Sequence, residues 1–343
     1  MMFQMVITGL FVGILLGFVL QRGRFCLTGG FRDMLVAKIN RLFYALLIAI
    51  LIQSIGVYTL FHFGVIAYTA GPFSWFASML GGFIFGIGMI YAGGCATGTW
   101  YRAGEGLIGS WIALFGYMLM SAMMREGPLG SLNARLQAPQ FAKNSIAETV
   151  GISVWILIGC LFVIVASVLY KEWKKPKLLI PTMIKKRTGL AHLLFEKRWH
   201  PFVTASLVGL IAILAWPLSA ATGRVFGLGI TTPSANILQY LVIGDTRYLN
   251  WGVFLVLGIF IGSFIAAKCS HEFRVRVPDA KTCIHSLVGG FIMGFGASLA
   301  GGCTIGNGLV MTALMTWQGW VTLLFIILGT WVASYFVFIR PNQ

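Results

Sequence analysis

Two cysteines of this 343-residue chain stand in nearly identical surroundings, Cys95 in "AGGCATG" and Cys303 in "AGGCTIG". A cysteine sulfur can be a nucleophile, a metal ligand or a soft, polarizable hydrogen-bonding group. The sequence has no CxxC pair and no Cys/His spacing typical of a zinc site, so we expect no metal and no cofactor. It also has no Ser-His-Asp or HExxH signature, so we do not expect an enzyme of those classes.

The other four cysteines differ in how distinctive their surroundings are. Cys26 lies in a related Gly-rich segment, "GRFCLTGGFRD". We expect Cys160, within "WILIGCLFVIV", to be a small buried hydrophobic residue, and Cys269 and Cys283 to be incidental neighbours of a basic loop. Candidate sulfur chemistry therefore concentrates at Cys95 and Cys303, with Cys26 as a related position.

The elements that must position these thiols belong to a membrane protein. The chain is 58% hydrophobic and 10% charged, with a mean hydropathy of +0.87, which is outside the range of soluble globular proteins. Its net charge of +16 does not indicate a nucleic-acid partner, because Lys and Arg gather in the cytoplasmic loops of membrane proteins. We expect an all-α integral membrane protein with nine spans, at roughly 3–21, 42–62, 74–92, 107–124, 151–170, 201–218, 250–267, 285–300 and 318–338.

Four Gly-rich segments between these spans contain or adjoin the candidate cysteines. They are 23–38, 93–106, 223–243 and 302–316. Each is semi-apolar and is neither a long polar loop nor a full span. We therefore expect four short re-entrant helical loops, since irregular backbone at membrane depth is tolerated only inside protein or along a wet path.

The chain also contains an internal repeat. Leu80–Gly98 and Val288–Gly306 agree at eleven of nineteen positions without a gap, and the cysteine is among the shared positions. A weaker similarity joins "GRFCLTGGFRD" to "GRVFGLGITTPSAN", which has no cysteine. Because four spans plus one connecting span is an odd number, the second copy should be inverted, a common transporter plan. The single membrane domain, 1–343, then divides into a first repeat at 1–124, a connector span at 151–170 and an inverted second repeat at 201–343.

The paired glycines predict a break in each helix. Glycine allows a sharp reversal, and a helix that restarts near the midplane presents unpaired N–H groups and its positive end to an anion. The alternative is that these glycines only pack tightly against a neighbouring helix. Because the pattern occurs twice, each time with a cysteine, we favour a substrate path. Its expected residues are Cys26, Gly93, Gly94, Cys95, Thr97, Gly301, Gly302, Cys303 and Thr304.

Basic residues predict the orientation of the chain. With the loop 171–200 in the cytoplasm, 20 of the 25 Lys and Arg residues fall on the cytoplasmic side. The N-terminus is then periplasmic and the C-terminus cytoplasmic. This basic loop could dock an acidic partner or lie on anionic membrane lipid, and we favour the lipid because the positive-inside bias alone explains the charge.

Few residues are available to drive transport. The sequence has no Walker A motif, and no acidic residue lies in the middle of an expected span, so the energy source stays open. We expect Asp33 to pair with Arg32 or a neighbour, and Glu105 to pair with Arg102, and the alternative is a role in gating or coupling.

The motifs "QRGRFCLTGGFRDM", "AGGCATGTWYRAGEG" and "AGGCTIGNG" resemble those of the YeeE/YedE family of bacterial sulfur transporters, over essentially the whole chain. The resemblance implies an hourglass-shaped inner-membrane protein with nine spans and four loops that dip toward its centre. It implies uptake of thiosulfate from the periplasm for cysteine synthesis, with functional cysteines at Cys26, Cys95 and Cys303. It also implies a cytoplasmic TusA/SirA-like partner, YeeD. Some family members serve selenium metabolism, so the resemblance leaves the sulfur or selenium species open.

Three hypotheses follow for the thiols. In the first, thiosulfate passes along Cys303, Cys95 and Cys26 through transient S–H···S contacts, and the thiols stay protonated because thiolates would repel the dianion. In the second, the protein is a membrane sulfurtransferase that carries a cysteine persulfide. In the third, it is a structural membrane scaffold for its partner.

Overall fold

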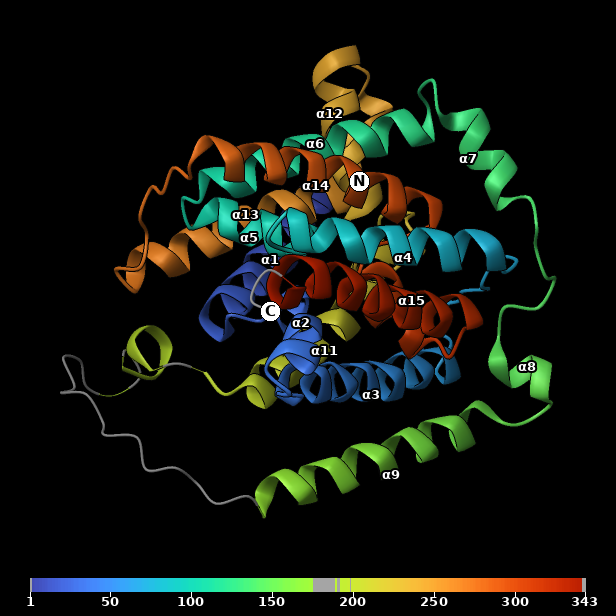
Figure 1. Cartoon of the computed structure of the whole chain (residues 1–343). Coiled ribbons are helices and arrows are strands. Elements are labelled where there is room, and N and C mark those ends of the chain that lie inside the picture. The colour runs from blue at the N-terminus through green and yellow to red at the C-terminus, as the bar shows by residue number, and fades with distance from the viewer. Residues whose placement is uncertain (1, 175–188, 190–191, 198, 341–343) are drawn as a thin grey trace.

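The computed structural model describes residues 2–174, 189, 192–197 and 199–340. Every regular element within these ranges is a helix (Figure 1). The long helices follow the apolar runs of the sequence, and they are α1 (Met2–Gly23), α3 (Arg41–His62), α4 (Trp75–Tyr91), α6 (Ile108–Arg125), α9 (Val154–Trp173), α11 (Pro201–Ala220), α13 (Trp251–Cys269), α14 (Ala280–Leu299) and α15 (Trp317–Ser334).

Short helices occupy the four segments that the sequence marks as Gly-rich. These are α2 (Leu27–Val36), α5 (Ala96–Gly104), α12 (Thr231–Ile243) and the π-helical turn η3 (Gly306–Met311). Further short elements lie in the connections, namely α7 (Gly130–Gln137), α8 (Ile146–Val150), η1 (His192–Glu196), η2 (Thr246–Tyr248) and η4 (Tyr335–Ile339).

In the described part of the chain, eight helical stretches are long and apolar enough to cross a membrane. They account for eight of the nine expected spans. The remaining expected span, α6, has 18 residues, and Ser110, Ser121 and Arg125 make it less apolar. It packs along α14. The chain is therefore an all-α, multi-pass membrane protein, and the number of nine crossings stays a prediction.

Helices α4 and α14, which carry the repeated sequence, cross in direct backbone contact. A Cβ atom on Gly88 would lie 2.5 Å from Met293 N, and one on Gly289 would lie 2.2 Å from Ala92 N, directly after the last residue of α4. A Cβ atom on Gly296 would likewise lie 2.6 Å from Gly81 O. Small residues let membrane helices approach this closely. Since Gly81 is equivalent to Gly289 and Gly88 to Gly296 in the repeat, the two crossing points are reciprocal.

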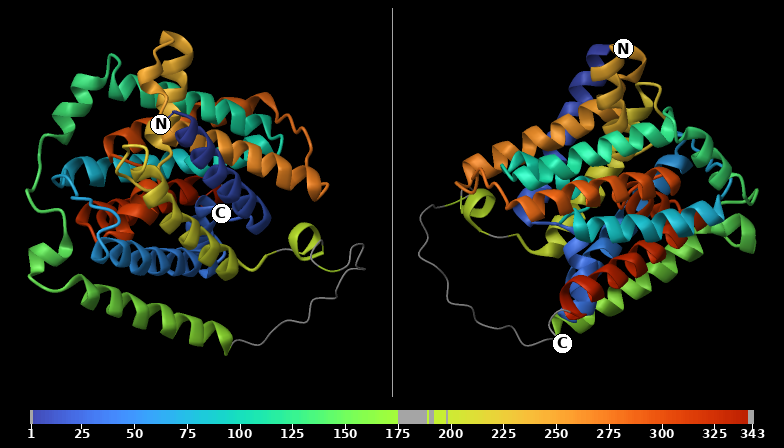
Figure 2. Two further views of the ribbon diagram at one scale, coloured as in Figure 1. Left: turned by 180° about the vertical axis from the view of Figure 1, so that it is seen from behind. Right: turned by 45° about the horizontal axis from the view of Figure 1, so that its top comes forward.

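The other long helices also pack in matching pairs (Figures 1 and 2). Helix α1 packs on α13 while α3 packs on α11, and α4 packs on α15 while α6 packs on α14. In the repeat, α1 and α3 correspond to α11 and α13, and α4 and α6 correspond to α14 and α15. Replacing each helix by its counterpart therefore turns the α1–α13 contact into the α11–α3 contact, and the α4–α15 contact into the α14–α6 contact. An inverted repeat would produce this reciprocal packing.

Helix α9, between the two halves, lies at the edge of the bundle beside α3 (Figures 1 and 2). Its buried residues are Ile158, Leu161 and Val165, and Cys160 is exposed. The expectation that Cys160 is buried is therefore wrong. The reason is that α9 packs one face on α3 and turns its remaining apolar surface outward.

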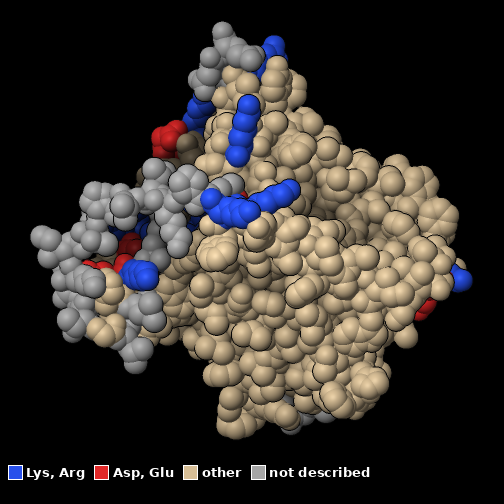
Figure 3. Space-filling model, turned by 90° about the horizontal axis from the view of Figure 1, so that it is seen from below, with Lys and Arg blue, Asp and Glu red and all other residues tan. Residues whose placement is uncertain are grey.

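Charge is distributed unevenly over the surface. Seen from below in Figure 3, most of the charged side chains in view gather toward one side, a few lie at the opposite edge, and most of the visible face carries none. The expected basic loop 171–200 lies mainly outside the described residues. Of its described part, η1 is tied to α1, because Arg22 Nε donates to Leu194 O at 2.8 Å and Arg22 Nη2 donates to Lys197 O at 3.3 Å.

Candidate functional site

The two Gly-Gly-Cys segments form the same turn. Helix α4 ends at Tyr91 and α14 ends at Leu299. The chain then reverses through a glycine in the left-handed region, with φ of +70° at Gly93 and +72° at Gly301. Glycine adopts this conformation without the steric cost that a Cβ atom brings. The predicted helix breaks are therefore present at equivalent positions in both halves.

Cys95 is the N-cap residue of α5. Its backbone is extended, and its Sγ accepts a hydrogen bond from Gly98 N at 3.3 Å. The residue is only 3% exposed. The first turn of a helix carries unpaired N–H groups and the positive end of the helix dipole. Cys95 thus places its sulfur where a short helix begins inside the protein.

Cys26 occupies the N-cap position of α2 and lies close to the same point. A Cβ atom on Gly98 would lie 3.4 Å from Cys95 Sγ and 3.9 Å from Cys26 Sγ. Both sulfurs therefore lie within 4 Å of one position on the first turn of α5. Cys26 is also buried, at 6% exposure. Two short helices from different segments of the first half bring these thiols together.

Cys303 is completely buried, at the turn that leads into η3. The side chain of Asn307 holds this turn, because its Nδ2 donates to Ala300 O at 2.8 Å and to Gly302 O at 3.1 Å. Asn307 is not among the site residues that the sequence predicts. The available signal was a polar amide directly after the cysteine motif, since a buried amide must find hydrogen-bond partners.

Two threonine hydroxyls lie unbonded beside these cysteines. Thr97 Oγ1 and Thr304 Oγ1 are buried and have no hydrogen-bond partner among the described residues. The Cys95 thiol faces the Thr304 side chain and lies near Cys26 and Cys303. Leaving a buried hydroxyl unsatisfied costs about 1–3 kcal/mol, so these groups are suited to bind a polar species. The three cysteines and the two threonines form one polar core.

The two halves meet around this core through α12. Trp100 Nε1 donates to Ser234 Oγ at 2.9 Å, which links α5 to α12. Tyr117 OH donates to Thr231 Oγ1 at 2.8 Å, which links α6 to α12. Both hydrogen bonds are buried. The second-half segment without a cysteine thus contributes contacts that close the core.

Arg102 brings a positive charge to the first-half thiols. Its Nη2 lies 3.4 Å from Cys26 Sγ, and its Nη1 donates to Gly93 O. Glu105 Oε1 has no hydrogen-bond partner in the described part of the chain. Among the described residues no ion pair within 4 Å joins Arg102 to Glu105, so the expected close pair is not formed. The guanidinium instead lies against Gly93 O and Cys26 Sγ. The other expected pair, Arg32 with Asp33, is present at 2.8 Å.

A pocket of about 240 Å³ reaches the turn before Cys303. Arg224, Gly301, Gly302 and the first turn of α12 line it. Arg224 Nη1 donates to Ser219 Oγ at 3.0 Å and to two backbone carbonyl oxygens. Since a guanidinium and a helix N-terminus both favour negative charge, this pocket suits a small anion.

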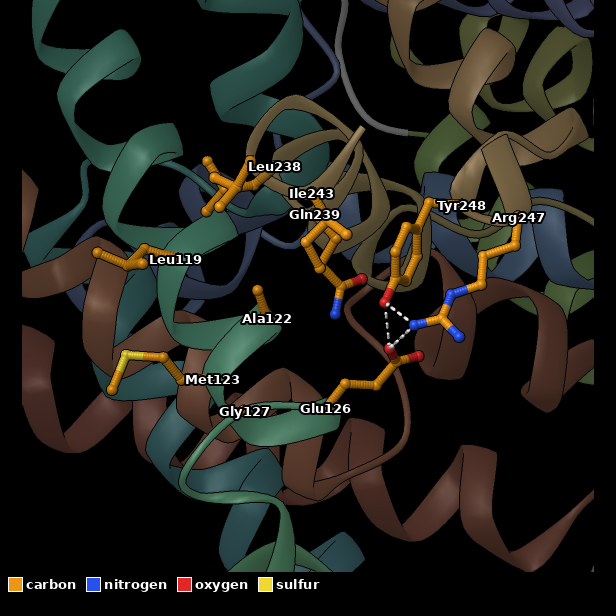
Figure 4. Close-up of a pocket in the computed structure, with 11 residues that line it drawn as sticks. Leu119, Ala122, Met123, Glu126, Gly127, Leu238, Gln239, Ile243, Arg247 and Tyr248 are labelled. Atoms are coloured by element: carbon orange, nitrogen blue, oxygen red, sulfur yellow. Dashed lines mark hydrogen bonds and ion pairs between the residues drawn. The ribbon is translucent and has the colours of Figure 1, made fainter. Parts of the chain in front are cut away.

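Figure 4 shows a separate pocket of about 360 Å³ between α6 and α12. Its lining is mainly apolar and includes Leu119 and Met123. At its edge, Tyr248 OH donates to Glu126 Oε2 at 2.6 Å, and Arg247 Nη2 donates to Tyr248 OH at 2.7 Å. This network fastens η2 to the end of α6. None of the candidate cysteines lines the pocket, and we assign it no part in the path.

The remaining cysteines lie away from the core. None of the six cysteines, all of which lie within the described residues, forms a disulfide, and Cys269 is exposed while Cys283 is half-buried. Across the described residues, no three His, Cys, Asp or Glu side chains are grouped so that they could hold a metal ion. The three buried thiols therefore present single sulfur atoms along the core rather than a joint ligand set.

An all-α, multi-pass membrane protein with broken helices around a polar core belongs to the transporter class. The chain is a member of the sulphur transport family, whose model matches residues 22–332. This is the YeeE/YedE family that the motifs predict. The chain is 66% identical over 342 residues to "Thiosulfate transporter TsuA" of Escherichia coli (strain K12), covering 100% of this chain and 97% of that protein.

Two further relatives set the range of the similarity. The chain is 32% identical over 353 residues to "Thiosulfate transporter TsuA" of Spirochaeta thermophila, covering 98% of this chain and 100% of that protein. It is 29% identical over 165 residues to "Probable transporter YedE" of Escherichia coli (strain K12), covering 48% of this chain and 40% of that protein.

Proposed function

We propose that this protein carries thiosulfate across the bacterial inner membrane, from the periplasm to the cytoplasm, as a source of sulfur. The observation that carries this proposal is the polar core, in which Cys26, Cys95 and Cys303 lie buried beside unbonded threonine hydroxyls. The names of the two full-length relatives support thiosulfate as the substrate. Thiosulfate suits such a core because it joins a soft terminal sulfur to a charged sulfonate group.

The path would begin at the pocket beside Arg224 and the Gly301–Gly302 turn. The ion would then meet Cys303, pass to Cys95 and reach Cys26 near the cytoplasmic end. Removing a charged group from water without compensation is costly, so each stage must replace part of the hydration shell. Helix N-termini and the hydroxyls of Thr97 and Thr304 supply donors for this purpose.

Sulfur-to-sulfur contact explains why cysteine stands at each stage. A thiol is a weak donor and is polarizable, so its contact with the terminal sulfur holds the ion without trapping it. Conduction needs sites that bind well enough to be entered and weakly enough to be left. In this mechanism the thiols stay protonated, because a thiolate would repel the dianion.

The proposal is tested by uptake of thiosulfate, and by growth on it as sole sulfur source, in cells that lack their own transporter. Cys26→Ala, Cys95→Ala and Cys303→Ala should each reduce uptake strongly. Cys160→Ala and Cys283→Ala are matched controls, because these thiols lie away from the core, and they should leave uptake unchanged. Undiminished uptake in all three core variants at normal protein level would contradict the site assignment.

The second candidate function is that of a membrane sulfurtransferase. The contact between Arg102 and Cys26 supports it, because a neighbouring guanidinium favours the nucleophilic thiolate form of a cysteine. Here the deprotonated cysteine would attack the outer sulfur of thiosulfate, the S–S bond would break, and sulfite would leave with the electron pair. Mass spectrometry of thiosulfate-treated protein separates the two functions. A persulfide on Cys26 or Cys95 supports transfer, and unmodified thiols together with uptake support transport.

The overall arrangement is part of the same proposal. We infer an inverted repeat of 1–124 and 201–343 about the connector at α9, supported by the reciprocal packing of α4 with α14 and of the outer helix pairs. We place the N-terminus in the periplasm and the C-terminus in the cytoplasm, with loop 171–200 on membrane lipid. The TusA/SirA-like partner, YeeD, would receive sulfur at the cytoplasmic end near Cys26.

A further inference from the structure

The arginines around the first-half thiols differ in whether a carboxylate neutralises them. Three of them lie in ion pairs, Arg22 with Glu272 at 3.5 Å, Arg24 with Glu272 at 3.0 Å and Arg32 with Asp33 at 2.8 Å. Arg102 is the exception within the described residues, where no carboxylate lies within 4 Å of its guanidinium. Its positive charge is therefore available to an anion.

The position of this guanidinium is set by the re-entrant turn. Nη1 donates to Gly93 O, which belongs to the left-handed glycine of the turn. A Cβ atom on Gly94 would lie 3.5 Å from the same Nη1, so the guanidinium lies directly against the turn. Nη2 then points to Cys26 Sγ at 3.4 Å. The head group thus spans the gap between the α4–α5 turn and the start of α2.

We propose that Arg102 binds the sulfonate group of thiosulfate while Cys26 contacts its terminal sulfur, so that the two side chains form the cytoplasmic-end subsite of the path. This inference rests on the proposed function and adds a charged specificity residue to it. A guanidinium has five N–H donors in a planar fork, and the bonds to Gly93 O and Cys26 Sγ use only two of them.

The chemistry of the ion explains why a charge belongs at this stage. Neutral thiols and hydroxyls line the core, and they stabilise a dianion less than a charge-assisted hydrogen bond does. A fixed positive charge at the last cysteine would draw the ion inward from Cys95. The ligand expected at this subsite is a small anion that carries both a soft terminal sulfur and a sulfonate group. Sulfate could accept hydrogen bonds from Arg102, but it has no terminal sulfur to contact Cys26.

The experiment compares Arg102→Gln and Arg102→Lys with Arg32→Gln, which removes an arginine on α2 that is paired with Asp33. The concentration dependence of thiosulfate uptake gives KM and the maximal rate. Arg102→Gln should raise KM by roughly 10- to 100-fold, the usual loss for a charge-assisted hydrogen bond. Arg102→Lys should raise KM less, because it keeps the charge but loses the fork. Arg32→Gln should leave KM unchanged.

A second readout is alkylation of Cys26 by a small maleimide, in a background where Cys160, Cys269 and Cys283 are replaced by Ser. Thiosulfate should slow this alkylation in the parent protein and in Arg102→Lys, and should give little protection in Arg102→Gln. Sulfate should protect less than thiosulfate in the parent protein. A purely structural role would lower the melting temperature and the maximal rate of both variants but leave KM and protection unchanged.

The outcomes separate this inference from the function on which it rests. If the parent protein takes up no thiosulfate, the proposed function fails. If the parent transports it and both Arg102 variants keep the parental KM and protection, the Arg102 subsite alone is refuted. If Arg102→Gln does not accumulate in the membrane, KM of Arg102→Lys decides. A raised KM in the folded lysine variant supports the subsite, and a parental KM would overturn the role of the guanidinium fork.

Discussion

At the scale of single residues, the buried thiols owe their positions to backbone geometry that only certain side chains allow. Gly93 and Gly301 take the left-handed conformation that reverses the chain, and the cysteine follows two residues later in each half. The two turns are then fastened by different groups. Arg102 binds Gly93 O in the first half, while Asn307 binds Ala300 O and Gly302 O in the second.

Asn307→Ala should therefore disturb the second turn and reduce thiosulfate uptake. The change removes the side-chain donor of Gly302 O and one of the two donors of Ala300 O, which Gln318 Nε2 also reaches at 3.2 Å. The loss should lower the free energy of unfolding by about 1–3 kcal/mol. Thermal unfolding in detergent and uptake per folded protein measure the two effects. Asn250→Ala is the matched control, because Asn250 Oδ1 caps α13 by accepting from Gly252 N at 3.0 Å, and it should cost stability without affecting KM. Parental uptake in Asn307→Ala would show that this amide does not support the path.

At the scale of elements, glycine decides how close the two repeated helices lie. The α4–α14 crossing leaves no room for a methyl group at Gly88 or Gly289. The broken ends of these helices lead directly to Cys95 and Cys303. The separation of the two helices thus sets the separation of the thiols.

Gly289→Ala should destabilise the protein, because its Cβ atom would lie 2.2 Å from the Ala92 nitrogen and force the helices apart. Overpacking of this kind typically costs about 1–3 kcal/mol. Thermal melting in detergent should show a lower midpoint, and uptake should fall with it. Gly159→Ala is the control, since a Cβ atom there meets nothing within 4 Å and alanine is the better helix former. Equal melting temperatures for both variants would contradict the tight crossing.

At the scale of the whole molecule, the basic residues predict which side of the membrane each loop faces. The loop between α13 and α14 should be cytoplasmic, and it is bounded by Cys269, which is exposed, and Cys283, which is half-buried. An impermeant maleimide should therefore label these thiols in inside-out vesicles and leave them unlabelled in right-side-out vesicles. Labelling in right-side-out vesicles alone would show that this loop is periplasmic, and the proposed order of the cysteines along the path would then run in the opposite direction. Replacing Cys160 by Ser removes the exposed thiol on α9 as a competing target.

The sequence by itself determined the membrane class, the family, the repeat and the positions of the helix breaks. These features depend on composition and on local backbone preference, which neighbouring residues largely control. Glycine pairs at equivalent positions were sufficient to predict the turns at Gly93 and Gly301.

Only the tertiary structure decided which side chains meet. The exposure of Cys160 follows from the single face that α9 packs on α3, and the partner of Arg102 follows from how α2 approaches the α4–α5 turn. The same holds for Asn307, whose amide reaches back across its own turn. The first two outcomes depend on packing between segments distant in the chain, and the third on how one turn folds back on itself. Hydrophobic periodicity carries no information about which polar groups are brought together in either way.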